Sequence, residues 1–218
     1  MYYSVKLSEM PPWTDQGGSI AAMCGKDCVI IATDYHPGSF QIDTPPSGFK
    51  KLFKINSKTF LGLTGLQMDI LAVHDRAMNR HNQNELSECR EMNPKEFSIV
   101  VSNMLSKQRS KPYYVESMVA GLEPDWNDGT LKPYICYMDW IGCRREAKNF
   151  LVCGTSALQL NGICTSLWRP NLSSDDLFKV ISSALHVGLS RDRTTRLGTS
   201  VFMYLIEADK ITERLVEL

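Results

Sequence analysis

The sequence predicts an α+β protein of four layers, in which two antiparallel sheets pack face to face and a pair of helices covers the outer face of each sheet. The chain has 218 residues, which is enough for one sizeable core. Short apolar runs typical of strands alternate in blocks with longer segments of helical periodicity, in the order strands, two helices, strands, two helices, strands. A four-layer αββα sandwich buries the apolar side of every block. We expect one domain over 17–218, preceded by an irregular N-terminal arm over 1–16.

The first block of strands begins with two continuous apolar runs, 20–23 and 29–32, which are separated by a short polar turn. Because neither run alternates with polar residues, the two runs predict a hairpin that is buried on both faces. Residues 35–50 contain several prolines and glycines and indicate a loop. The runs at 52–55 and 59–63 predict a second pair of strands.

Two helices are expected after these strands. Residues 67–81 have apolar positions at helical spacing, which places His74 and His81 on a polar face rather than in a metal site. The positions expected to face the core are Met68, Leu71, Ala72 and Met78. The second helix has a clear start, because Asn93 is a good cap and Pro94 suits the first helical position. Its expected core positions are Phe97, Val100, Val101, Met104 and Leu105.

Strands return in the middle of the chain. They are expected at 113–121, 131–138 and 146–153, and Gly129 belongs to a turn region between the first two. A third helix follows Gly154. Its expected core positions are Leu158, Ile163, Cys164 and Leu167.

The last helix starts at Ser173 or Ser174, because acidic residues in its first turn complement the positive end of a helix. Its expected buried positions are Leu177, Ile181, Ala184, Leu185 and Gly188. Two closing strands, 199–206 and 210–216, complete the pattern. The chain therefore ends in a strand pair that can join one of the two sheets.

The charge balance excludes two classes of main partner. Lys and Arg number 24 and Asp and Glu number 24, so the formal net charge is zero. Nucleic acid and anionic membrane surfaces both attract proteins through a basic field, so we expect neither as the main partner. No apolar segment is long enough for a membrane span, and residues 1–16 lack the apolar run of a signal peptide.

The seven cysteines are scattered through apolar stretches and form no Cys-x-x-Cys pair. This pattern indicates free, mostly buried thiols in a reducing compartment, either the cytoplasm or the nucleus. A zinc site is the alternative, but the four histidines do not fall at ligand spacing beside the cysteines. We therefore expect no metal site.

Several short segments carry a resemblance to a known family. The segments are 17–23, 25–29, 60–66, 112–114, 119–122 and 139–143, and the most specific is 164–172 (CTSLWRPNL), which continues to 176–178. Together they resemble the beta subunits of the proteasome, which belong to the N-terminal-nucleophile (Ntn) hydrolases. The resemblance covers residues 17–218, and it implies the Ntn-hydrolase fold, a four-layer αββα sandwich.

The resemblance also implies a chemistry. An active subunit of this family cuts its propeptide between glycine and threonine, and the freed threonine attacks a peptide carbonyl with its own amino group or a water as base. A buried lysine and acidic residues support such a site. The supporting positions that match in this chain are Asp34, Lys51, Thr155, Asp192 and Thr195. The nucleophile position falls on Gly18 when the first hairpin is aligned to Asp34 without a gap, and glycine has no hydroxyl.

The resemblance therefore implies a non-catalytic subunit, in which Lys51 and Asp192 are a retained structural ion pair. Two alternatives remain. Alignment from Lys51 places Ser19 at the nucleophile position, because the 35–50 loop is one residue longer than in relatives. Ser19 would then be freed as an N-terminal serine by cleavage after Gly18. The other alternative is a free-standing Ntn hydrolase that acts on small amides.

Partners and location follow from the same resemblance. A beta subunit of this kind contacts other beta subunits in its own seven-membered ring and in the opposite ring, and alpha-ring subunits on one side. Its neighbours carry out the threonine-type hydrolysis in the cytoplasm and nucleus, and no cofactor is needed. Arg193 and Arg196 are either contacts with a neighbouring subunit or solvated loop charges.

Overall fold

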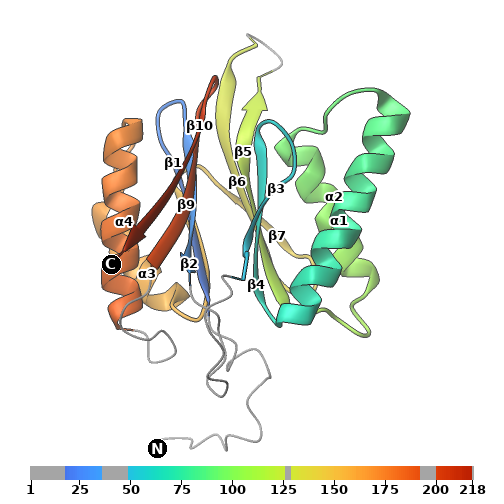
Figure 1. Cartoon of the computed structure of the whole chain (residues 1–218), viewed down its shortest axis with the longest axis horizontal. Helices are drawn as coiled ribbons and strands as arrows, with labels where there is room; N and C mark the ends of the chain where they lie inside the picture. The colour runs from blue at the N-terminus through green and yellow to red at the C-terminus, as the bar shows by residue number, and fades with distance from the viewer. Residues whose placement is uncertain (1–17, 36–48, 126–128, 192–199, 218) are drawn as a thin grey trace, which may run out of the picture.

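The computed structural model describes residues 18–35, 49–125, 129–191 and 200–217. These residues form two five-stranded antiparallel sheets and four helices. Figure 1 shows the sheets face to face, with one helix pair outside each sheet. One pair is α1 (Gln67–Glu88) and α2 (Pro94–Lys107), and the other is α3 (Ala157–Leu167) and α4 (Ser174–Ser190). The predicted four-layer αββα class is therefore confirmed.

The first sheet has the strand order β10-β9-β2-β1-β8. Its strands are β1 (Ser19–Cys24), β2 (Val29–Tyr35), β8 (Phe150–Gly154), β9 (Ser200–Ile206) and β10 (Ile211–Glu217). The predicted first hairpin is confirmed, because β1 pairs antiparallel with β2 and Ala21 lies opposite Ala32. All six residues of β1 are buried, as expected for a strand with a sheet on one face and helices on the other.

The second sheet has the strand order β3-β4-β5-β6-β7. Its strands are β3 (Leu52–Lys54), β4 (Thr59–Gly65), β5 (Val115–Pro124), β6 (Leu131–Met138) and β7 (Arg144–Ala147). The predicted pairing of the third and fourth strands is confirmed, with Phe53 opposite Leu61. Most of the 127–129 turn expected between β5 and β6 lies outside the described residues.

The strand predicted at 146–153 was wrong, because this segment forms parts of two strands in two different sheets. β7 pairs with β6, with Ala147 opposite Ile135. β8 pairs with β1, with Phe150 opposite Met23. Lys148 and Asn149 form a bend in which the chain crosses from one sheet to the other. This polar pair interrupts the apolar pattern at the crossing.

The predicted core face of α1 was correct only in part, because Met78 is half-buried and packs against the core but other predicted positions face outward. Met68 is 72% exposed and Leu71 is 41% exposed. The buried positions are Ile70, Val73, Ala77 and His81. The true stripe continues through a histidine, which the prediction had placed on the polar face. His81 instead packs edge-on against the ring of Phe97, with ring centroids 6.1 Å apart.

The predicted face of α3 was correct only in part. Cys164 is fully buried, and Leu160 shares its face, although Leu160 was not predicted. Leu158 is 89% exposed and Leu167 is 38% exposed. An apolar helix such as α3 has hydrophobic residues on more than one side, so the sequence pattern alone does not select the side that packs.

The other two helices follow their predictions closely. Asn93 caps α2 by accepting a hydrogen bond from the Glu96 N–H at 3.0 Å, and the Glu96 carboxylate accepts from the Asn93 N–H at 3.2 Å. Ser173 caps α4 by accepting from the Asp176 N–H. All of the positions predicted to be buried in α4 are buried. Strong capping and amphipathic spacing therefore predicted these two helices correctly.

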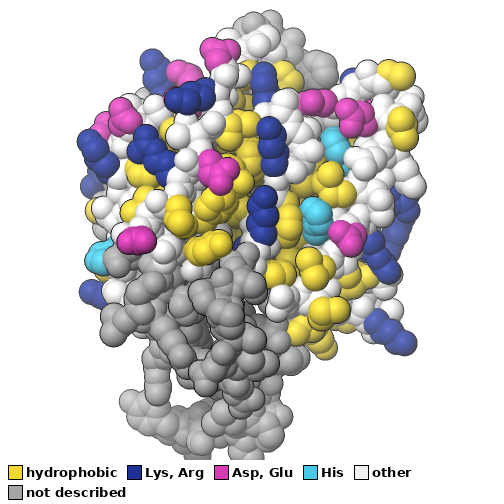
Figure 2. Space-filling model, viewed as in Figure 1, with side chains coloured by type: hydrophobic (Ala, Val, Ile, Leu, Met, Phe, Trp, Pro, Cys, Tyr) yellow, Lys and Arg dark blue, Asp and Glu magenta, His cyan; other side chains and the backbone are white. Residues whose placement is uncertain are grey.

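The hydrophobic core is divided among the layers. One cluster lies between the sheets, and the other two lie between each sheet and its helix pair. Figure 2 shows that hydrophobic side chains reach the surface in the middle of one face, while Lys, Arg, Asp and Glu are spread around them. None of the helices in the described segments is long and apolar enough to cross a membrane.

Candidate functional site

The polar cluster predicted from the resemblance lies at the N-terminal end of β1, at the border between the two sheets. The structure brings together four of the predicted residues, Gly18, Asp34, Lys51 and Thr155. Gly18 precedes β1, Asp34 is near the end of β2, Lys51 precedes β3 and Thr155 follows β8. The other two predicted residues, Asp192 and Thr195, lie outside the described residues, as do Arg193 and Arg196.

Asp34 and Lys51 form a buried ion pair. Lys51 Nζ lies 2.9 Å from Asp34 Oδ2, and the two side chains are only 5% and 3% exposed. The second carboxylate oxygen, Oδ1, accepts a hydrogen bond from the Ser19 N–H at 2.7 Å. Charges removed from water require such partners, since an unpaired buried charge is strongly destabilising. The pair therefore fixes the start of β1 against β2 and the segment before β3.

Gly18 lies against this ion pair. A Cβ atom placed on Gly18 would be 2.6 Å from Lys51 Nζ and 3.2 Å from Thr64 Oγ1, so a side chain at this position would point at the lysine amine. The Gly18 carbonyl accepts hydrogen bonds from Thr64 Oγ1 and from the Thr155 N–H, each at 3.1 Å. The lysine amine thus occupies the space that a side chain would need, and the position offers no hydroxyl, thiol or amine side chain for attack.

Ser19 is held by different partners. It is completely buried, and its Oγ accepts a hydrogen bond from the Ser156 N–H at 3.0 Å. Ser156 is the cap residue of α3, so the Ser19 side chain is directed to the start of that helix. The Ser19 carbonyl accepts from Thr33 Oγ1 at 3.0 Å. Ser19 is therefore a buried residue of β1, and its amide, its carbonyl and its hydroxyl oxygen each have a hydrogen-bond partner.

Sequence reasoning did not assign four residues of this cluster, namely Thr33, Thr64, Glu116 and Ser156. Glu116 stands out, because its carboxylate accepts from the Gly154 N–H at 2.8 Å and from the Tyr137 hydroxyl at 2.6 Å. Burial, together with this hydrogen bond to Glu116, raises the pKa of Tyr137 well above its ordinary value. The available signal for Glu116 was a charged residue close to the buried apolar run of β5. Thr64 lies in one of the segments that carried the resemblance.

Thiol chemistry is not supported at the buried cysteines. Burial raises the pKa of Cys24 to about 12, that of Cys28 to about 11 and that of Cys164 to about 12. Because the thiolate is the nucleophile and the metal ligand, the raised pKa disfavours both roles for these thiols at neutral pH. The described residues also contain no group of three or more His, Cys, Asp or Glu side chains suited to a metal ion.

The fold and this cluster first define a class. Two antiparallel sheets between helix pairs, with a buried lysine–aspartate pair at the start of the first strand, are the architecture of the Ntn hydrolases. Within that class, the family model described as "Proteasome subunit" matches residues 14–203 of this chain. The chain therefore belongs to the proteasome subunit family.

Individual relatives agree with this family. The chain is 50% identical over 198 residues to proteasome subunit beta type-3 of Drosophila melanogaster. The aligned residues cover 91% of this chain and 93% of that protein. It is 42% identical to a probable proteasome subunit beta type-3 of Schizosaccharomyces pombe, covering 92% and 95% of the two chains. It is 39% identical to proteasome subunit beta type-3 of Saccharomyces cerevisiae, covering 95% and 97%. The predicted resemblance to proteasome beta subunits is confirmed.

Proposed function

We propose that this chain is a non-catalytic structural subunit of the beta ring of the proteasome 20S core, corresponding to the beta type-3 subunits. In this role it completes the ring and supports the threonine-protease sites of its neighbours. The observation that carries the proposal is Gly18, which places a bare backbone beside Lys51 where a nucleophilic side chain would have to lie. Supporting charges cannot replace a missing hydroxyl.

Lys51 pairs with Asp34, and the ion pair expected between Lys51 and Asp192 stays a prediction because Asp192 lies outside the described residues. The Lys51–Asp34 pair has a structural role in this proposal. Lys51 and Asp34 hold the uncut backbone, because Asp34 binds the Ser19 N–H and Lys51 fills the space beside Gly18. Lys51 faces position 18, but the glycine there offers it no hydroxyl to act on, so its remaining partner is the Asp34 carboxylate. The same residues that support catalysis in active relatives therefore stabilise the start of β1 here.

The partners of the proposed subunit are other beta subunits in the same ring and in the opposite ring, and alpha-ring subunits. Its location is the cytoplasm and nucleus. The balanced total of 24 basic and 24 acidic residues suits a protein that shares its surface with several neighbours, since a large field of one sign would oppose close packing. Charged side chains of both signs on the face in Figure 2 agree with such shared surfaces.

The alternative nucleophile, Ser19, is disfavoured by its contacts. Its Oγ is fully buried and accepts from the Ser156 N–H, and its amide donates to Asp34. An active Ser19 would have to leave these partners before it could attack.

The decisive experiment is the intact mass of the chain in proteasome particles purified from the source cell. We expect a mature chain that still contains residues preceding Ser19. A chain that begins at Ser19 would contradict the proposal. Recovery of the chain only as a monomer or a small homo-oligomer would contradict its place in the particle and favour a free-standing hydrolase.

A second experiment tests catalysis directly. A covalent inhibitor that reacts with N-terminal threonine should label neighbouring subunits and leave this chain unlabelled. The variant Ser19→Ala, incorporated into particles, should keep the peptidase rates per particle unchanged, as should the control variant Ser183→Ala at an exposed position of α4. A selective loss of one peptidase activity in the Ser19→Ala particles would favour the catalytic alternative.

A further inference from the structure

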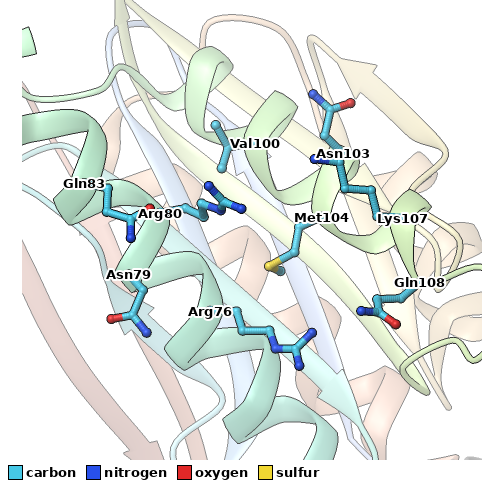
Figure 3. A pocket seen from close by; sticks show the side chains of 9 residues that line it. All are labelled: Arg76, Asn79, Arg80, Gln83, Val100, Asn103, Met104, Lys107 and Gln108. Carbon is cyan, nitrogen blue, oxygen red and sulfur yellow. The ribbon is translucent and has the colours of Figure 1, made fainter. Parts of the chain in front are cut away.

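A groove lies between α1 and α2, in the outer helix layer and separate from the polar cluster. Its volume is about 550 Å³, within the usual range of ligand sites. Figure 3 shows that Arg76 and Arg80 extend from α1 toward α2, and that Lys107 lies on α2 on the other side. We call this depression the basic groove, defined by Arg76, Arg80 and Lys107 and the residues between them.

The charge of the basic groove is unbalanced. None of the residues that line it is an aspartate or glutamate. Among the ion pairs of the described residues, none includes Arg76, Arg80 or Lys107. The whole chain has as many acidic as basic residues, so this is a local excess of positive charge. A concave surface of one sign concentrates the electrostatic field and attracts ligands of the opposite sign.

The uncharged residues indicate what kind of anion fits. Val100 and Met104 are half-buried at the bottom of the groove and pack against the core beneath the helices. Asn79 is exposed beside the arginines of α1, and Asn103 is exposed on α2 near Lys107. Side-chain amides both donate and accept hydrogen bonds, as a peptide backbone requires, and methionine adapts to apolar side chains of varied shape. These features favour an acidic peptide over a polyphosphate or nucleic acid, which would leave the apolar bottom unused.

Arg76 is already held in place. Its guanidinium carbon lies 5.3 Å from the centroid of the Tyr113 ring, in a cation–π contact. This contact restricts the side chain and leaves the planar N–H edge available for a carboxylate, which arginine binds through two parallel hydrogen bonds. A side chain that is restrained before binding loses less entropy on binding.

We infer that the basic groove binds an acidic peptide segment of a neighbouring proteasome subunit. Carboxylates of the segment pair with Arg76, Arg80 and Lys107, and an apolar side chain of the segment rests on Met104. The source of the segment rests on the proposed function, whereas the preference for an acidic peptide rests only on the groove.

The preference is tested with the full chain and a fluorescent short peptide, in which Glu and Asp residues flank a central Leu. Fluorescence anisotropy should show binding that weakens as salt is added. The same peptide with Gln and Asn in place of Glu and Asp should bind at least about tenfold more weakly. An RNA oligonucleotide or a polyphosphate that binds as tightly as the acidic peptide would overturn the assignment.

Two double variants separate the groove from net charge. Arg76→Gln with Arg80→Gln should weaken peptide binding about tenfold, because two charge-assisted contacts are lost. Lys95→Gln with Arg191→Gln removes the same charge from exposed positions outside the groove and should leave affinity within about twofold. Circular dichroism verifies that both variants are folded. Equal effects of the two variants would overturn the groove as the binding site.

The source of the segment is tested in particles purified from the source cell with a carbodiimide, which joins a lysine amine to a contacting carboxylate with loss of water. Mass spectrometry should find Lys107 joined to an Asp or Glu of another subunit. If the chain is in the particle but Lys107 forms no such link and the acidic peptide does not bind, the inference fails and the proposed function stands. If the chain is absent from the particle, the proposed function fails, and the neighbouring subunit as source fails with it.

Discussion

The buried ion pair and the basic groove use the same kind of side chain in opposite ways. Lys51 is 5% exposed and lies 2.9 Å from its carboxylate partner. Arg76, Arg80 and Lys107 are exposed, and no ion pair within the described residues involves them. A buried charge must be paired within the chain, whereas an exposed charge is free to pair with another molecule. In the proposed subunit, the buried pair therefore serves stability, and the exposed cations of the helix layer are available to a partner.

The strongest test of this contrast is Lys51→Met. The substitution leaves the Asp34 carboxylate buried without its partner, so we expect the free energy of unfolding to fall by about 3–5 kcal/mol. Urea denaturation of the full chain measures this change. The double variant Lys51→Met with Asp34→Asn removes both charges and keeps an acceptor for the Ser19 N–H, so it should recover much of the loss. A single variant within about 1 kcal/mol of the parent would show that the pair is not structural.

A smaller effect is expected for Gly154→Ala, which tests the packing beside the ion pair. Gly154 has φ of +92°, and a Cβ there would lie 2.0 Å from the Gly18 carbonyl oxygen. Since backbone must shift, we expect a loss of about 2–3 kcal/mol in urea denaturation. Gly129→Ala is the control, because Gly129 also has a positive φ, +70°, but has nothing within 4 Å. Equal losses for both variants would show that only the backbone angle matters.

Helix α2, which forms one wall of the basic groove, offers the next test. Asn93→Ala removes the cap of α2 and should reduce the free energy of unfolding by about 1 kcal/mol. The same substitution at Asn103, exposed in the middle of α2, should cause no loss because alanine favours helices. Thermal unfolding followed by circular dichroism compares the two variants. A larger loss at Asn103 than at Asn93 would mean that the groove residues hold the helix.

The smallest effect is expected for Arg80→Gln. This exposed residue has no ion pair within the described part of the chain, so the free energy of unfolding should change by less than about 0.5 kcal/mol. Urea denaturation in parallel with Lys51→Met gives the comparison. A loss as large as that of the lysine variant would remove the distinction between the two regions.

The order of elements could be predicted because the apolar residues of each block recur with the spacing of a strand or of a helix, and because α2 and α4 have strong N-terminal caps. The buried faces of α1 and α3 could not be predicted in full, because the hydrophobic pattern of each helix is ambiguous for a different reason. In α1 the buried stripe ends in His81, a residue that pattern rules count as polar. In α3 apolar residues lie on several sides, and only tertiary packing selects Leu160 over Leu158.

The candidate site was predicted from resemblance rather than from local pattern. Gly18, Asp34, Lys51 and Thr155 lie close together, but their contacts depend on distant pairings that no local signal reveals. Ser19 and Ser156, for example, are separated by 137 positions and meet only because β1 pairs with β8. The basic groove was not predicted, because its residues alternate with core residues on two helices whose relative placement the sequence does not specify.

The pairing of the first hairpin with strands from much later in the sequence has a consequence for synthesis of the chain. The β1–β2 hairpin is the centre of the first sheet, yet β1 pairs with β8 and β2 with β9. Both long edges of this apolar hairpin therefore stay unpaired until residues 150–154 and 200–206 leave the ribosome. Such late, long-range pairing slows folding and exposes strand edges that can aggregate. A nascent chain of this kind needs protection of its first hairpin until its last strands are made.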